Sequence, residues 1–135
     1  MLGELEGDGK TTICDSEAGV ATLLRLQPGQ TDIVLVVAQP GAKSLDVARR
    51  AIELAPEDTD LLVVANRVRD QADLEVIQTA VGNRELVVVP EDDAITRAEQ
   101  EGLAPIDVDP DAPAVRALIN LGERLAALSP RGERV

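Results

Sequence analysis

The chain has 135 residues, of which 44% are apolar and none is aromatic, and its formal net charge is −12. This length is sufficient for one folded domain, and the apolar content predicts a globular chain rather than a disordered one. The negative charge argues against a nucleic-acid partner, because phosphate backbones are bound by Lys and Arg. One cysteine and no histidine exclude an intramolecular disulfide and a zinc site supplied by this chain alone.

No stretch of the sequence has the features of a membrane span or of a signal peptide. No apolar run reaches transmembrane length, and the start, "MLGELEGDGK", is acidic and glycine-rich. We therefore expect a cytoplasmic protein without a membrane partner.

The first motif in chain order, Gly9-Lys10-Thr11, matches the end of a phosphate-binding P-loop. A P-loop also requires glycine at position 4, where Glu4 stands, and a helix after the lysine. The residues after Lys10 are instead β-branched and apolar, which favours an extended strand. We reject the P-loop and predict a turn at residues 7–9 followed by a strand at Thr11–Cys14, with Cys14 in the buried core.

Strand and helix patterns then alternate along the chain. Continuous apolar runs predict interior strands, covered on both faces, at Ile33–Ala38, Leu61–Ala65 and Leu86–Val89. Apolar residues at helical spacing predict helices over residues 45–55, 74–81 and 115–125, the first closed by Pro56 and the second by Gly82. This order predicts an α/β fold, with a mostly parallel sheet and helices on both faces. We expect one domain over residues 1–128 and a frayed tail over residues 129–135.

Ligands of open parallel sheets bind beyond the carboxyl ends of the strands, so the residues that follow each strand are the candidates for a site. These segments are Asp15–Gly19, Gln39–Gly41, Asn66–Val68 and Pro90–Asp92. We expect Asp15, Asn66 and Asp92 to lie on the same rim of the sheet.

The sequences of these segments resemble a known family. "DSEAG", "DIVLVVAQPGAKSLDVARR", "VVANRVRD" and "VVPEDDAI" have the order and spacing found in the later part of MinD/ParA-type deviant-Walker ATPases. The resemblance runs from about Thr11 to about Leu128, and it is greatest to the CooC-type ATPases that insert nickel during carbon monoxide dehydrogenase maturation, whose motif reads D-x-E-A-G. It implies a SIMIBI-like P-loop NTPase fold, ATP and Mg²⁺ as cofactors, and metalloenzyme maturation or partitioning as the activity of the parent protein.

The resemblance also implies roles for five residues. Asp15 would be the catalytic, Mg²⁺-associated acid, and Gly19 would approach the γ-phosphate. Asn66 would hydrogen-bond adenine, and Pro90 and Asp92 would line the base pocket. Ordinary structural roles compete in each case: a turn or helix cap for Asp15, a turn for Gly19, a strand end for Asn66 and a helix cap for Asp92. Guanine is disfavoured, because the GTPase pattern N-K-x-D would need an acid at Arg69.

Two other candidate metal sites fail. "DVDPDAP" at residues 107–113 begins like a calcium loop but has Ala112 where the turn glycine belongs and Leu118 where the bidentate glutamate belongs. Capping of the final helix explains these acids better. Cys14 lacks the Cys-x-Cys partner that the nickel-insertion subgroup carries.

The P-loop, its signature lysine and the P-loop strand of the resembled family are missing from this sequence. We therefore expect an incomplete ATP-binding protein, inactive alone, whose binding of ATP and Mg²⁺ is weak or absent. The sequence allows a protein partner or a homodimer. The alternative is a noncatalytic acidic α/β module that binds another protein; a receiver-like domain is disfavoured because no predicted strand ends in lysine.

Overall fold

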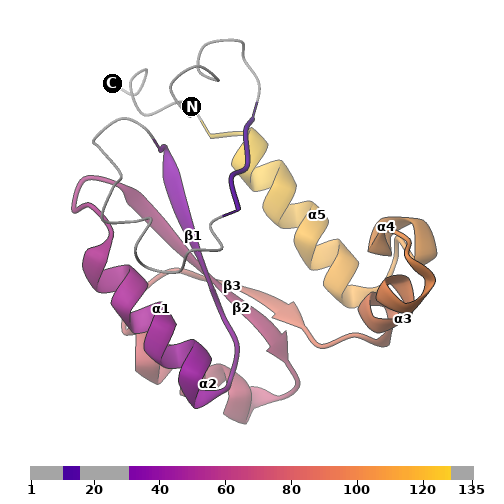
Figure 1. Ribbon diagram of the computed structural model, residues 1–135, viewed down its shortest axis with the longest axis horizontal. Coiled ribbons are helices and arrows are strands. Elements are labelled where there is room, and N and C mark those ends of the chain that lie inside the picture. Colours follow the sequence, from indigo (N-terminus) through magenta and orange to yellow (C-terminus); the bar gives the residue numbers. More distant parts are fainter. Residues whose placement is uncertain (1–10, 16–30, 129–135) are drawn as a thin grey trace.

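A computed structural model describes residues 11–15 and 31–128 of the chain (Figure 1). The predicted turn at residues 7–9, Gly19 and the predicted tail at residues 129–135 lie outside the described residues. Strands and helices alternate in the order β1 (Ile33–Ala38), α1 (Ala42–Leu54), β2 (Asp60–Val68), α2 (Gln71–Val81), β3 (Leu86–Pro90), α3 (Asp93–Glu101), α4 (Pro105–Val108) and α5 (Pro113–Ala126).

The strands form a three-stranded parallel sheet in the order β1-β2-β3. The parallel α/β fold predicted from the apolar runs is thereby confirmed. The expectation that all three runs are interior strands is wrong for β1 and β3, which are the outer strands of the sheet that the described residues form. Apolar residues on both faces of a strand reflect cover by helices, and they do not require a hydrogen-bonded neighbour on each side.

Side chains of β2 alternate between two apolar cores, as the pleat of a strand requires. Val63 and Ala65 pack with residues of α1 and α2, whereas Leu62 and Val64 pack with residues of α5. Helices therefore cover both faces of the sheet, with α1 and α2 on one face and α5 on the other (Figure 1).

The expected strand at Thr11–Cys14 is wrong. Residues 11–15 have no regular secondary structure, Ile13 is 78% exposed, and Cys14 is exposed rather than buried. A short β-branched segment becomes a strand only if a neighbour pairs with its backbone groups. Among the described residues, β1 pairs with β2 alone, and no strand pairs with residues 11–15.

The sequence patterns also missed α3 and α4. The buried residues of α3 are Ala94 and Ala98, and α4 buries none, so neither helix shows the large apolar stripe by which helices are identified from sequence. Local signals define α3 instead. Asp92 caps its first turn, and Gly102 ends it in the left-handed conformation with φ of 67°.

Candidate functional site

The carboxyl ends of β2 and β3 lie together at one edge of the sheet. Asn66 is opposite Val89 in the strand register, and Val68 is opposite Pro90. The parallel topology therefore brings Asn66, Pro90 and the adjoining Asp92 to the same edge, which is where ligands bind in open parallel sheets.

The end of β2 departs from regular strand geometry. Asn66, expected just after the strand, lies inside it, and the register shifts between Asn66 and Val68. Arg67, at this irregularity, has φ of 59°, a left-handed conformation that is uncommon for a residue other than glycine. Such irregularities bend a strand and change the direction of the side chains beside them.

Two contacts join the ends of β2 and β3 beyond this shift. The Arg67 guanidinium donates to Glu91 Oε1 over 2.9 Å, and the Glu91 N–H donates to the Val68 carbonyl over 3.0 Å. Because the ion pair is exposed to solvent, we expect it to stabilise this end of the sheet less than the backbone hydrogen bond does. Together they fix Asn66 relative to the Pro90 loop.

Asn66 is half-buried, and the alternation of β2 places it on the face of Leu62 and Val64. Its side chain makes no hydrogen bond with any residue that the structure describes. The amide therefore retains both its donor and its acceptor groups for a ligand.

The loop from β2 to α2 is held by an ion pair that sequence reasoning missed. Asp73 accepts from Arg69 Nε over 2.9 Å, from the Arg69 Nη2 group over 3.2 Å and from the Arg69 backbone N–H over 3.0 Å. These hydrogen bonds lower the pKa of Asp73 and raise that of Arg69. The ion pair could have been predicted from the Arg-x-x-x-Asp spacing at the start of a helix. Asp70 caps the same helix by accepting from the Asp73 N–H.

Asp92 caps two helices at once. Its Oδ1 accepts from the Ala94 N–H at the start of α3, and its Oδ2 accepts from the Ala114 N–H at the start of α5, each over 3.0 Å. Both N–H groups lower the pKa of the Asp92 carboxyl, and that of Ala114 has the larger effect. The helix-cap role considered for Asp92 thus describes its contacts, and both of its oxygens are engaged.

The expected capping of α5 by residues 107–113 is wrong. Asp109 accepts from the Asp111 N–H over 3.0 Å, which closes a turn within the loop, and Ala112 at the start of α5 provides no side-chain cap. Asp92 takes this role from 22 positions earlier in the sequence.

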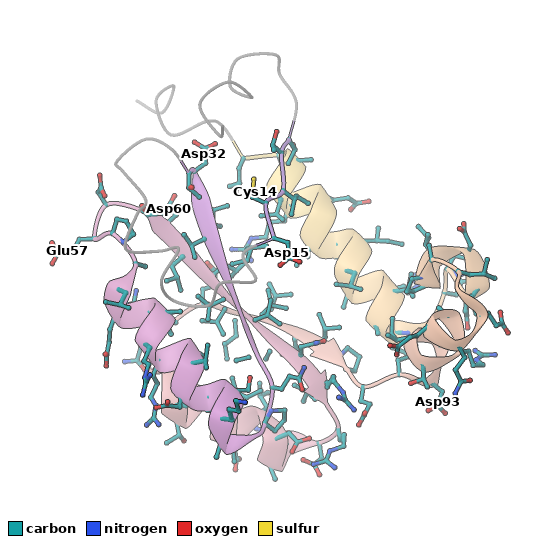
Figure 2. The ribbon with its side chains drawn as sticks, in the orientation of Figure 1. Cys14, Asp15, Asp32, Glu57, Asp60 and Asp93 are labelled. Atoms are coloured by element: carbon teal, nitrogen blue, oxygen red, sulfur yellow. The ribbon has the colours of Figure 1, made fainter. Side chains whose placement is uncertain are left out.

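Asp15 does not join the group at the sheet edge. Figure 2 shows Cys14 and Asp15 between β1 and α5, whereas Asp93, at the start of α3, lies at the right of the picture. Asp15 is exposed. Within residues 11–15 and 31–128, no three His, Cys, Asp or Glu side chains gather so that they could hold a metal ion.

The two best-formed hollows in the described part of the chain lie away from the residues of the sheet edge. One, of about 270 Å³, lies between β3 and α5 and is lined by residues such as Val87 and Leu121. The other, of about 420 Å³, lies on α2 beside Val76. Neither includes Asn66, Pro90 or Asp92. No helix among the described residues is long and apolar enough to cross a membrane.

Comparisons with known proteins agree with this fold. No protein-family model matches the chain. An uncharacterized ATP-binding protein of Methanocaldococcus jannaschii is 32% identical over 108 residues, which cover 76% of this chain and 42% of that protein. The cell division protein MinD of Aquifex aeolicus superposes with a TM-score of 0.58 and 24% sequence identity, over 75% of this chain and 46% of that one.

The MinD similarity establishes the fold, so the fold that the family resemblance implied is confirmed. The chain spans less than half the length of both proteins.

Proposed function

We propose that this chain forms the base-binding part of a MinD/ParA-type ATP-binding protein, with Asn66 as the adenine-recognising residue and Pro90 beside the base. The observation that carries the proposal is the placement of Asn66, with its uncommitted amide, next to the Pro90 loop at the carboxyl edge of a parallel sheet. The description of the Methanocaldococcus jannaschii relative as ATP-binding supports it.

Asp92 has a positioning role in this proposal. Its carboxylate is engaged by the N–H groups of Ala94 and Ala114, so it holds the wall of the base site and does not contact the base. This differs from the pocket-lining role that the family resemblance implied.

The described residues do not fit a Mg²⁺–triphosphate site. Asp15 lies apart from Asp93 at the start of α3 (Figure 2), and in the described part of the chain no three potential metal ligands gather. A net charge of −12 also repels phosphate. ATP should therefore bind about as weakly as adenosine, because its affinity derives from the base.

Calorimetry with adenosine, ATP and guanosine tests this proposal. We expect weak binding of adenosine and ATP with similar affinity, at least tenfold weaker binding of guanosine, and loss of binding in Asn66→Ala. Asn120→Ala is the matched control, because Asn120 is also an asparagine but lies on α5 beside the hollow at β3. Tight ATP binding without adenosine binding, or unchanged binding in Asn66→Ala, would refute the proposal.

Hydrolysis is a separate test. Phosphoryl transfer depends on positioning and on cations around the γ-phosphate, so we expect no ATPase activity above background from this chain alone. Mg²⁺-dependent phosphate release that Asp15→Asn abolishes would contradict this expectation.

We also propose that the parent activity is maturation of carbon monoxide dehydrogenase rather than partitioning. The D-x-E-A-G sequence at residues 15–19 supports this branch. The purified chain should then bind nickel-free carbon monoxide dehydrogenase in biolayer interferometry. If the chain does not bind this enzyme but binds the partner protein of a partitioning ATPase, partitioning is favoured as the parent activity.

A further inference from the structure

The helices α3 and α4 form a lobe beyond the end of the sheet, at the start of α5 and away from α1 and α2 (Figure 1). We define the acidic lobe as residues 91–112. It carries eight Asp and Glu side chains and one arginine, Arg97, and so holds seven of the twelve net negative charges of the chain. Most of these acidic side chains are exposed.

Two large apolar side chains lie exposed within this acidic surface. Leu103 and Ile106 are three positions apart, and each is 51% exposed. Acidic residues, Glu101 and Asp107, flank this pair in the sequence. Exposed apolar side chains rimmed by charged ones occur on surfaces that bind another protein.

Hydrogen bonds stabilise the start and the end of α3 within the lobe. Asp92 accepts hydrogen bonds from the first turns of α3 and α5, and the Leu103 N–H donates to the Ala98 carbonyl over 2.9 Å. Gly102 takes the left-handed conformation that this helix end requires. Leu103 is therefore presented by an ordered turn, which lowers the entropy lost on binding.

Several carboxylates of the lobe have no cation beside them. Asp93, Glu99, Glu101 and Asp107 form no ion pair with any residue that the structure describes, and Asp111 pairs only loosely with Arg116, over 3.6 Å. These carboxylates can accept hydrogen bonds from basic side chains of a partner.

We propose that the acidic lobe is the docking surface for a basic, amphipathic helical segment of a protein partner. The apolar face of that segment covers Leu103 and Ile106, and its Lys or Arg side chains pair with the surrounding carboxylates. A second copy of this chain does not fit, because two lobes would bring like charges together, and nucleic acid and anionic lipid are repelled for the same reason. The proposal does not depend on nucleotide binding.

A synthetic 14-residue amphipathic helix of leucine, alanine and lysine is the probe, and the same peptide with glutamate in place of lysine is its control. Titration into the ¹⁵N-labelled full chain, without nucleotide, should shift the amide resonances of the lobe and leave those of α1 and α2 unchanged. The affinity should fall at least tenfold between 50 and 500 mM NaCl, because salt screens the charges. The glutamate peptide should not bind.

Paired variants distinguish binding of the peptide at the acidic lobe from nonspecific binding to exposed apolar side chains elsewhere. Leu103→Ser with Ile106→Ser, and separately Glu101→Lys with Asp107→Lys, should each weaken the lysine peptide at least fivefold. Val47→Ser with Val76→Ser is the matched control, because these valines are 45% and 46% exposed on α1 and α2. All substituted side chains are exposed, and circular dichroism checks that each variant folds.

The proposal is overturned if the lysine peptide does not bind, if the glutamate peptide binds equally well, or if the shifts fall on α1 and α2. Equal weakening by the control pair of variants would also overturn it.

Discussion

At the scale of single residues, Asp92 links two helices. Its carboxylate accepts one N–H from the first turn of α3 and one from the first turn of α5, where Ala114 lies 22 positions after Asp92 in the sequence. Each helix cap contributes about 0.5–2 kcal/mol. We therefore expect Asp92→Ala to lower the free energy of unfolding by about 1–3 kcal/mol, measured by urea denaturation.

The neighbouring residue provides the control for this variant. Asp93 is also acidic and lies in the first turn of α3, but it makes no cap. Asp93→Ala should change stability by less than about 0.5 kcal/mol, as is usual at exposed positions. Equal effects of the two substitutions would show that charge near the helix start matters and the double cap does not.

The pKa of Asp92 is lowered by the two N–H groups that it accepts from, and this makes stability depend on pH. A carboxyl with a folded-state pKa below its unfolded value stabilises the fold above the unfolded pKa and loses this effect as pH falls through the folded pKa. Stability should thus decline below about pH 4, where these carboxyls take up protons in the unfolded chain while the lowered pKa values of Asp92 and Asp73 keep them ionised in the fold. Between pH 5 and pH 3 the urea midpoint should fall less in Asp92→Asn than in the unchanged protein, and equal slopes would contradict this assignment.

At the scale of elements, the end of β2 combines a strained residue with a weak ion pair. The left-handed conformation of Arg67 costs about 1–2 kcal/mol, whereas an exposed ion pair such as Arg67–Glu91 contributes about 0–1 kcal/mol. Arg67→Gly should therefore leave stability unchanged or raise it slightly. Arg67→Val should lower it by about 1 kcal/mol or more, because a β-branched residue resists positive φ.

Glu91→Gln tests the ion pair without touching the backbone of Arg67. It should change the denaturation midpoint by less than Arg67→Val does. If Glu91→Gln and Arg67→Gly are both strongly destabilising, the ion pair rather than the backbone controls this end of β2.

At the scale of the whole molecule, much of the fold was predictable because aliphatic runs mark strands that helices cover. The runs at Ile33–Ala38, Leu61–Ala65 and Leu86–Val89 lie within the observed strands, and their order gives the parallel topology. The same topology predicted that Asn66 and Pro90 share an edge. These features follow from local patterns and from the rules for parallel sheets.

The rest depends on contacts that local patterns do not contain. The strand expected at Thr11–Cys14 needed a partner strand, and the double cap by Asp92 joins positions distant in sequence. α3 buries only alanines, and positive φ at Arg67 follows from the register shift beside it and not from its side chain. Of these features only α3 has a local signal, in its cap residues Asp92 and Gly102.

The outer edge of β1 gives a prediction for the whole molecule. In the sheet that the described residues form, β1 pairs only with β2, and its sequence, IVLVVA, contains neither charge nor proline. Val37 points to the face of the sheet opposite to α1 and is 56% exposed. The helix on that face, α5, packs against β3 at the other side of the sheet. Such an uncharged strand edge favours association between copies, whereas the net charge of −12 opposes it.

Light scattering should therefore show association that increases with protein concentration and rises between 0.1 and 0.5 M NaCl, because salt screens the repulsion. Val37→Lys should reduce this association with little loss of stability, since the new charge lies on an exposed position of the edge strand. Val36→Lys is the control, because Val36 is 6% exposed and a charge there should unfold the protein. If Val37→Lys leaves association unchanged, the edge of β1 is not the contact between copies.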